Sequence, residues 1–267
     1  LKSGETVEHL HTLSKIDNWF LYHLQGIVEV ERTLVAAKID AALLRRAKQY
    51  GFSDRTIARL TGQDEQIVRT KRQRLGVLPS FKLIDTLAGE FDAETNYLYA
   101  TYHGDSHDVR PLGKKSVVVL GAGPYAIGSS VEFDWSAVNA VQTLQDRGRK
   151  TIVINSNPET VSTDFDRSDR LYFDELTFER VQDITEFERP SGVVVSVGGQ
   201  VANNLARALS SAGNILLGTA AVDIDRAEDR QKFSSLLHDI GVDQPRWAEV
   251  TSLAAAKKFA ETVGYQV

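Results

Sequence analysis

Apolar residues in the first part of the chain recur every three or four positions, as they do along the buried face of an α-helix. The stripe is clearest between Ile16 and Val28, where Asp17 stands at an expected N-cap position. Stripes of this kind, with capping residues and terminal glycines, predict five helices: 6–14, 16–28, 41–50, 53–61 and 64–74. Residues 90–102 mix turn and short-helix patterns, and 104–113 is typical of a linker. The pattern predicts an all-α helical domain over residues 1–110.

The pattern changes beyond residue 115 to short, continuous apolar runs that are rich in β-branched residues. Such runs are typical of buried strands in a parallel sheet, and they occur at 116–120, 151–155, 192–197 and 215–218. Helical patterns separate them, at 137–147, 183–188 and 201–212. Because strands and helices alternate, residues 115–225 are predicted to form an open, doubly wound parallel sheet of the α/β class. Further helical patterns follow within 226–267.

The composition is that of an ordinary globular chain, with 42% hydrophobic and 25% charged residues among 267. No apolar run reaches the roughly 18 residues of a membrane span, so no membrane partner is expected. The absence of cysteine excludes disulfides, thiolate nucleophiles and cysteine-bound zinc. Acidic and basic residues balance over residues 1–113, and residues 114–267 carry the net charge of −5. Neither part is basic, which argues against nucleic acid as a required partner.

A glycine-rich turn follows the first predicted strand. Gly121, Gly123 and Gly128 lie in a sequence that meets the G-x-G-x-x-A dinucleotide fingerprint, in which glycines let a phosphate approach the backbone. That fingerprint also requires an acidic residue at the end of the second strand, to bind a ribose hydroxyl. Asn155 occupies that position. The pattern therefore favours a packing turn, with a Rossmann-type nucleotide-binding oxidoreductase as the alternative.

Polar residues also follow the next two strands of the predicted sheet. Asn157 and Glu159 lie in a polar loop after the second strand, and Gly199 and Gln200 follow the third. Glu132 comes soon after the glycine turn. Because the carboxyl ends of parallel strands share one edge, where open α/β sheets bind ligands, these residues are candidates for one site. Such a loop could hold an anion, an amine or a cation, or serve only as a hydrogen-bonded connection.

Two further patterns give weaker indications of a functional site. Residues 53–76 resemble a helix-turn-helix whose second helix carries Arg69 and Arg72. Acidic residues at the front of that helix would face DNA phosphates with like charge, so a packing or interface unit is favoured and a DNA-binding regulator is the alternative. His103 and His107 have a spacing found in metal sites. With no further convergent ligand, a solvated polar stretch is the favoured interpretation.

Several longer motifs together resemble one family. In the second part of the chain they are Glu-Phe-Asp at 132–134, Asn-Pro-Glu-Thr-Val-Ser-Thr-Asp at 157–164, Ser-Asp-Arg-Leu-Tyr-Phe at 168–173, Gly-Gly-Gln at 198–200 and Ile-Asp-Arg-Ala-Glu-Asp-Arg at 224–230. Their order and spacing are similar to those of the large chain of carbamoyl phosphate synthetase, in particular its second, carbamoyl-phosphate-forming half. Upstream, several motifs are similar to the helical oligomerisation domain between the halves: 15–20, 51–54, 82–86, 97–99 and 101–102. The sequence at 129–135 resembles the eukaryotic branch.

This resemblance implies a division of the chain. Residues 1–110 would be the oligomerisation domain, 115–225 the Rossmann-like pre-ATP-grasp domain, and 226–267 the beginning of an ATP-grasp module. The chain begins at Leu1 and contains no methionine, so we interpret it as a piece of a longer polypeptide. By the resemblance, the residues that contact ATP and magnesium would follow Val267. We therefore expect no complete catalytic set, no metal site, no bound cofactor and no activity from this piece alone.

The resemblance also implies the reaction of the parent enzyme. Carbamoyl phosphate would be made from bicarbonate, ammonia and two ATP, with magnesium or manganese as the metal and potassium as a further candidate. Carbamate would pass through an internal tunnel to the second half, and this piece would form part of the tunnel wall. The implied tunnel-lining or site-shaping residues are Glu132, Gly121, Gly123, Gly128, Asn157, Glu159, Gly199 and Gln200. Ala126 stands where the family often has arginine, which puts one charged tunnel contact in question.

Partners follow from the same resemblance. They are the other domains of the same large chain, a glutaminase subunit or domain, and further copies bound through residues 1–110. The expected compartment is the cytoplasm, with the mitochondrial matrix as the alternative. The motifs leave open whether the parent enzyme serves arginine, urea or pyrimidine synthesis, and whether its nitrogen comes from glutamine or from free ammonia.

Overall fold

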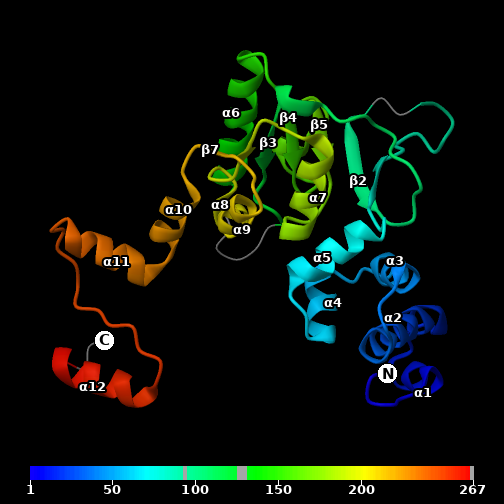
Figure 1. Cartoon of the computed structure of the whole chain (residues 1–267), viewed down its shortest axis with the longest axis horizontal. Coiled ribbons are helices and arrows are strands. Elements are labelled where there is room, and N and C mark those ends of the chain that lie inside the picture. The colour runs from blue at the N-terminus through cyan, green and yellow to red at the C-terminus, as the bar shows by residue number, and fades with distance from the viewer. Residues whose placement is uncertain (93–94, 125–130, 265–267) are drawn as a thin grey trace.

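The computed structural model describes residues 1–92, 95–124 and 131–264. Figure 1 shows a group of helices at the N-terminus, a β-sheet with helices packed around it, and a C-terminal helical segment, residues 230–263, that extends away from the sheet. The N-terminal helices are α1 (Val7–Ser14), α2 (Asn18–Ala36), α3 (Ala41–Gln49), α4 (Asp54–Thr61) and α5 (Glu65–Arg74). These helices confirm the five that the apolar stripes predict, and α2 continues beyond its predicted end at residue 28.

Local sequence explains where these helices begin and end. The Asp17 side chain accepts the Trp19 N–H at the start of α2, and Ser53 caps α4 by accepting the Thr56 N–H. Gly62 ends α4 with a φ of 64°, a left-handed conformation that glycine adopts without strain. The apolar faces of the helices then meet in a shared core, which includes Val30, Leu34, Leu44, Ala47, Ile57 and Val68.

A seven-stranded sheet forms the centre of the α/β group, which is the sheet together with the helices that pack on it. The strand order is β1-β2-β5-β4-β3-β6-β7. All neighbouring strands are parallel except β1 and β2, which are antiparallel. The strands are β1 (Ser80–Leu83), β2 (Tyr97–Thr101), β3 (Ser116–Leu120), β4 (Lys150–Ile154), β5 (Arg170–Tyr172), β6 (Val193–Val194) and β7 (Leu216–Leu217). The helices and 3-10 turns of this part are η1 (Gly113–Lys115), α6 (Glu132–Asp146), η2 (Val161–Thr163), α7 (Phe178–Glu188), α8 (Gly199–Asn203), α9 (Ala206–Ser211), α10 (Ala221–Glu228), α11 (Arg230–Asp239) and α12 (Leu253–Val263). The predicted α/β class with a parallel sheet is confirmed.

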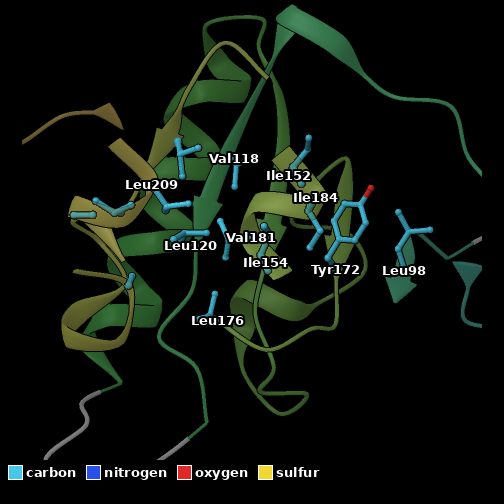
Figure 2. Close-up of a cluster of buried hydrophobic side chains, with 14 of the residues drawn as sticks. Leu98, Val118, Leu120, Ile152, Ile154, Tyr172, Leu176, Val181, Ile184 and Leu209 are labelled. Carbon is cyan, nitrogen blue, oxygen red and sulfur yellow. The ribbon is translucent and has the colours of Figure 1, made fainter. Parts of the chain in front are cut away.

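Helices pack on both faces of the sheet, because the side chains of a strand point alternately to either face. On β3, Val119 packs with Ala137 of α6, whereas Val118 and Leu120 lie in a separate core with Ile184 of α7. Figure 2 shows this larger core, which gathers apolar side chains from β2, β3, β4, β5, α7 and α9. Burial on both faces explains why β3 and β4 are continuous apolar runs in the sequence.

The all-α prediction for residues 1–110 is wrong over residues 80–101. There, β1 and β2 form an antiparallel pair, with Ser80 opposite Thr101, and β2 joins the main sheet beside β5. Phe81 and Leu98 are 2% and 1% exposed, and both belong to the large core of the α/β group. These strands are short and pair with a strand distant in the sequence, so their own periodicity could not reveal them.

Buried ion pairs join helices α4 and α5 to α7. Arg72 on α5 has a side chain that is 0% exposed, and it donates to both carboxylate oxygens of Asp54 on α4 at 2.9 to 3.0 Å. Arg72 also contacts Asp183 on α7 at 3.1 Å, and Arg69 reaches the same carboxylate at 2.7 Å. Loss of one partner would leave another charge buried and unpaired. These pairs therefore fix the helical group on α7.

A second part of the same charge cluster surrounds Glu179 at the start of α7. Its carboxylate accepts from Lys48 Nζ at 2.5 Å, from the Asp54 N–H at 2.6 Å and from the Tyr102 hydroxyl at 3.4 Å. Burial above all raises the pKa of the Tyr102 hydroxyl, which stays protonated and donates. Burial also acts to raise the pKa of Asp54, but Lys48 and Arg72 outweigh it and lower that pKa. Each buried acid of the cluster thus contacts at least one buried base.

Candidate functional site

The strand order places a topological switch point between β3 and β6. From β3 the chain continues through α6 to β4 on one side, whereas β6 and β7 lie on the other side. Open α/β sheets bind ligands beyond the carboxyl ends of the strands at such a point. Gly121 follows β3 there and Gly198 lies just beyond β6, and a Cβ atom at Gly198 would lie 2.5 Å from the Gly121 carbonyl oxygen. The structure therefore brings the two glycine turns into direct contact, as their shared edge predicted.

Asn155, directly after β4, fills the space beside the first glycine turn. It is 1% exposed, and its Oδ1 accepts the Gly123 N–H at 3.0 Å. A Cβ atom at Gly121 would lie 2.4 Å from Asn155 Cγ, so only glycine fits at that position. The Gly123 N–H that a phosphate could use is already engaged, and a buried amide stands where a ribose-binding acid is required. This geometry argues against the dinucleotide-binding alternative.

The loop after β4 is fixed to α6 by hydrogen bonds of Ser162. The Ser162 N–H donates to the two carboxylate oxygens of Asp134 on α6, at 3.1 and 3.4 Å. The Ser162 Oγ accepts from Asn155 Nδ2 at 3.3 Å. Within the loop, Asn157 Oδ1 accepts the Glu159 N–H at 3.0 Å, which closes a small turn of the kind that asparagine favours. Asn157 is therefore a buried shaping residue, whereas Glu159 is exposed.

An open hollow of about 430 Å³ lies between the start of α6 and this loop. It is lined by Val131, Asp134, Trp135, Pro158, Glu159, Thr160, Val161 and Asp164. The polar lining is acidic, and Trp135 and Val131 contribute exposed apolar surface. Carboxylates accept hydrogen bonds from amino groups and repel anions. The hollow is thus suited to a small molecule with an N–H donor.

The remaining predicted site residues take different positions. Glu132 is the first residue of α6 and is exposed. Gly199 has a φ of 68°, and a Cβ atom there would lie 2.7 Å from the Phe133 ring, so α8 packs closely on the start of α6. Gln200 is exposed on α8. Gly128 lies outside the described residues.

Burial of the basic residues contradicts the helix-turn-helix interpretation of residues 53–76. Arg69 and Arg72 are 2% and 0% exposed and pair with acids on α4 and α7, so neither can contact DNA. The favoured interpretation, in which these two helices form a packing unit, is correct. Sequence reasoning missed the charge cluster itself. Its signal was that Arg72 stands four residues after the buried Val68 and so shares the inward face of α5.

The two histidines of the predicted linker are not brought together as ligands. His107 stacks on Phe81 with ring centroids 5.4 Å apart, and its Nδ1 accepts the Phe81 N–H. His103 instead contacts the Gln49 carbonyl oxygen at 3.3 Å. Over residues 1–92, 95–124 and 131–264, no group of three His, Asp or Glu side chains is placed to hold a metal ion. None of the helices described in these ranges has the length and apolar character that a membrane crossing requires.

Two family models match the chain. Residues 1–76 match the oligomerisation domain of the carbamoyl-phosphate synthetase large chain, and residues 113–226 match the preATP-grasp domain of carbamoyl phosphate synthase. The chain is 57% identical over 265 residues to the arginine-specific carbamoyl phosphate synthase large chain of Cutaneotrichosporon cutaneum, which covers 98% of this chain and 22% of the relative. It is 55% identical over 274 residues to the mitochondrial arginine-specific large chain of Neurospora crassa, covering 100% of this chain and 23% of the relative. It is 48% identical over 268 residues to the mitochondrial carbamoyl-phosphate synthase [ammonia] of Aquarana catesbeiana, covering 99% of this chain and 18% of the relative.

The fold and the site thus define a helical domain joined to a Rossmann-like α/β domain of the pre-ATP-grasp class. The chain belongs to the family of carbamoyl phosphate synthase large chains, as its motifs indicated. It spans 18% to 23% of the length of these three relatives.

Proposed function

We propose that this chain is part of the large chain of a carbamoyl phosphate synthase, a ligase that makes carbamoyl phosphate from bicarbonate, ammonia and two ATP. The identity of 57% to such a large chain, across 98% of this sequence, carries the proposal. Helices α1 to α5 would serve domain assembly and oligomerisation, in line with the family model that they match. Residues 226–267 would begin an ATP-grasp module. The proposed partners are the other domains of the large chain and a glutaminase.

ATP and magnesium or manganese, with potassium as a further candidate, would act on other parts of the enzyme. The residues described in this chain do not fit these groups. The Gly123 N–H at the switch point is taken by Asn155, and no cluster of three potential metal ligands is present in the described ranges. No step of the reaction is therefore assigned to a nucleotide or a metal on this chain. Two of the three relatives are named mitochondrial, which supports the mitochondrial matrix as the compartment.

The α/β group would form part of the wall of the passage along which carbamate reaches the second phosphorylation site. The acidic hollow beside α6 supports this role, because the amino group of carbamate can donate hydrogen bonds to Glu159 or Asp164. The negative charge of carbamate opposes tight retention by the same carboxylates.

The ratio of ATP consumed to carbamoyl phosphate formed tests this passage in the full-length enzyme that contains the chain. Glu159→Ala removes one carboxylate from the hollow, and carbamate that leaks must be made again, so the ratio should rise above two. Asp146→Ala is the matched control, because Asp146 is an exposed carboxylate at the far end of α6. A ratio for Glu159→Ala equal to that of the unmodified enzyme would refute the passage.

The isolated chain provides a second test. Residues 1–267 alone, supplied with bicarbonate, ammonia and MgATP, should form no carbamoyl phosphate, because the residues described here include no fitted nucleotide or metal site. Formation of carbamoyl phosphate at a rate comparable to that of the full-length enzyme would contradict the proposal that ATP and the metal act on other parts of the enzyme.

A further inference from the structure

A chain of buried hydrogen bonds connects the glycine turn after β3 to helix α6. The Gly123 N–H donates to Asn155 Oδ1 at 3.0 Å, and Asn155 Nδ2 donates to Ser162 Oγ at 3.3 Å. The Ser162 N–H then donates to Asp134 at 3.1 Å. Asn155 and Ser162 are each 1% exposed and Asp134 is 7% exposed. Hydrogen bonds shielded from water in this way are costly to leave unmade, so the connection has a defined geometry.

Asp134 is the member that attaches the loop to α6. Ser162 Oγ connects η2 to Asn155 after β4, and the backbone hydrogen bonds of the turn are internal: the Thr163 N–H donates to the Thr160 carbonyl and the Asp164 N–H to the Val161 carbonyl. These close the turn but leave its distance from α6 undefined. The hydrogen bonds from the Ser162 N–H to the Asp134 side chain span the two elements.

The same two elements form opposite sides of the acidic hollow. Trp135 and Val131 line it from the start of α6, and Glu159 and Val161 line it from the loop. The separation of α6 and η2 therefore determines the width of the hollow and the position of the Glu159 carboxylate across it.

We infer that Asp134 is a positioning residue, which holds η2 against α6 and so sets the width of the hollow through which carbamate would pass. This inference rests on the proposed function of the hollow. Asp134 acts through the loop backbone, so the role requires an acceptor oxygen at this position rather than a titrating acid. Asp134→Asn keeps an acceptor oxygen and should preserve the role, whereas Asp134→Ala should abolish it.

Hydrogen–deuterium exchange of the peptide that covers residues 156–164 measures the attachment directly. In Asp134→Ala the exchange should be about tenfold faster, the change expected when one buried hydrogen bond is lost. In Asp134→Asn and in the control Asp146→Ala it should match the unmodified protein. Ser162→Ala removes the hydroxyl but keeps the N–H, so it should affect exchange less than Asp134→Ala. Unchanged exchange in Asp134→Ala would overturn the inference.

The ratio of ATP consumed to carbamoyl phosphate formed by the full-length enzyme distinguishes failure of this inference from failure of the proposed function. Asp134→Ala should raise the ATP consumed per carbamoyl phosphate above two, and Asp134→Asn should keep it at the value of the unmodified enzyme. If Glu159→Ala raises the ratio but Asp134→Ala does not, the passage stands and the positioning role is refuted. If neither variant raises the ratio while exchange in Asp134→Ala is faster, the proposed function fails and the inference fails with it. Circular dichroism and thermal unfolding of Asp134→Ala confirm that the fold is retained before either comparison.

Discussion

Replacement of Arg72 by methionine tests whether the buried charge cluster holds the helical group on the α/β group. The Arg72 side chain is 0% exposed and donates to Asp54, to Asp183 and to the Val77 carbonyl oxygen. Methionine fills similar space without a charge or a donor, so two buried carboxylates each lose a partner. Breaking a buried ion pair on one side costs about 3 to 5 kcal/mol. For a chain of this size, that corresponds to a fall in Tm of about 10 °C.

Thermal unfolding of the 267-residue chain, followed by circular dichroism, measures the effect. Arg74→Met is the matched control, since Arg74 lies on the same helix and is exposed. In the double variant Arg72→Met/Asp183→Asn the loss should be about 0.5 to 3 kcal/mol smaller than the sum of the two single losses, because the two side chains share a contact. A Tm for Arg72→Met no lower than that of Arg74→Met would refute a structural role for the cluster.

Two further changes address other parts of the fold. Burial raises the pKa of Asp174 to about 6 from a usual 3.8, so the folded state holds a proton that the unfolded state has lost, and its stabilising contribution disappears as the pH rises through 6. Asp174→Asn removes this titration and should raise the free energy of unfolding more at pH 7.5 than at pH 5, by about 1 kcal/mol; an equal gain at both pH values would contradict the assignment. Gly198→Ala places a Cβ atom 2.5 Å from the Gly121 carbonyl oxygen and should cost about 1 to 3 kcal/mol by overpacking. Gly213→Ala, at an exposed turn with a φ of 90° and open space, should cost only about 1 kcal/mol, and a larger loss there than at Gly198 in urea unfolding would refute the packing argument.

The elements that the sequence predicted well are those whose signal is local. The helices α2 and α4 begin at Asp17 and Ser53 because those side chains cap the next turn of the same helix. The strands β3 and β4 are buried on both faces, so each is a continuous apolar run. Such features depend on a few neighbouring residues and can be read without knowledge of the rest of the chain.

The elements that were missed depend on partners far away in the sequence. The strands β1, β2 and β5 span three to five residues each and gain their hydrogen bonds from one another. The charge cluster likewise depends on residues that are far apart in the sequence. Arg72 has the appearance of a surface residue until Asp183, on a helix of the other group, is known to meet it. The spacing from Val68 places Arg72 on the inward face of α5, but no local pattern names the distant acid that pairs with it.

At Asn155 a local sequence signal and a contact that only the fold reveals occur at the same residue. From the sequence, it was the residue that failed the dinucleotide fingerprint, because an acid is required there. In the structure its Oδ1 accepts the Gly123 N–H while its Nδ2 donates to Ser162, so the position needs an acceptor and a donor on one short side chain. Aspartate, ionised at neutral pH, would place a charge in a site that is 1% exposed. The departure from the fingerprint is therefore a requirement of this loop, and it is also the reason that the switch point here serves packing rather than a nucleotide.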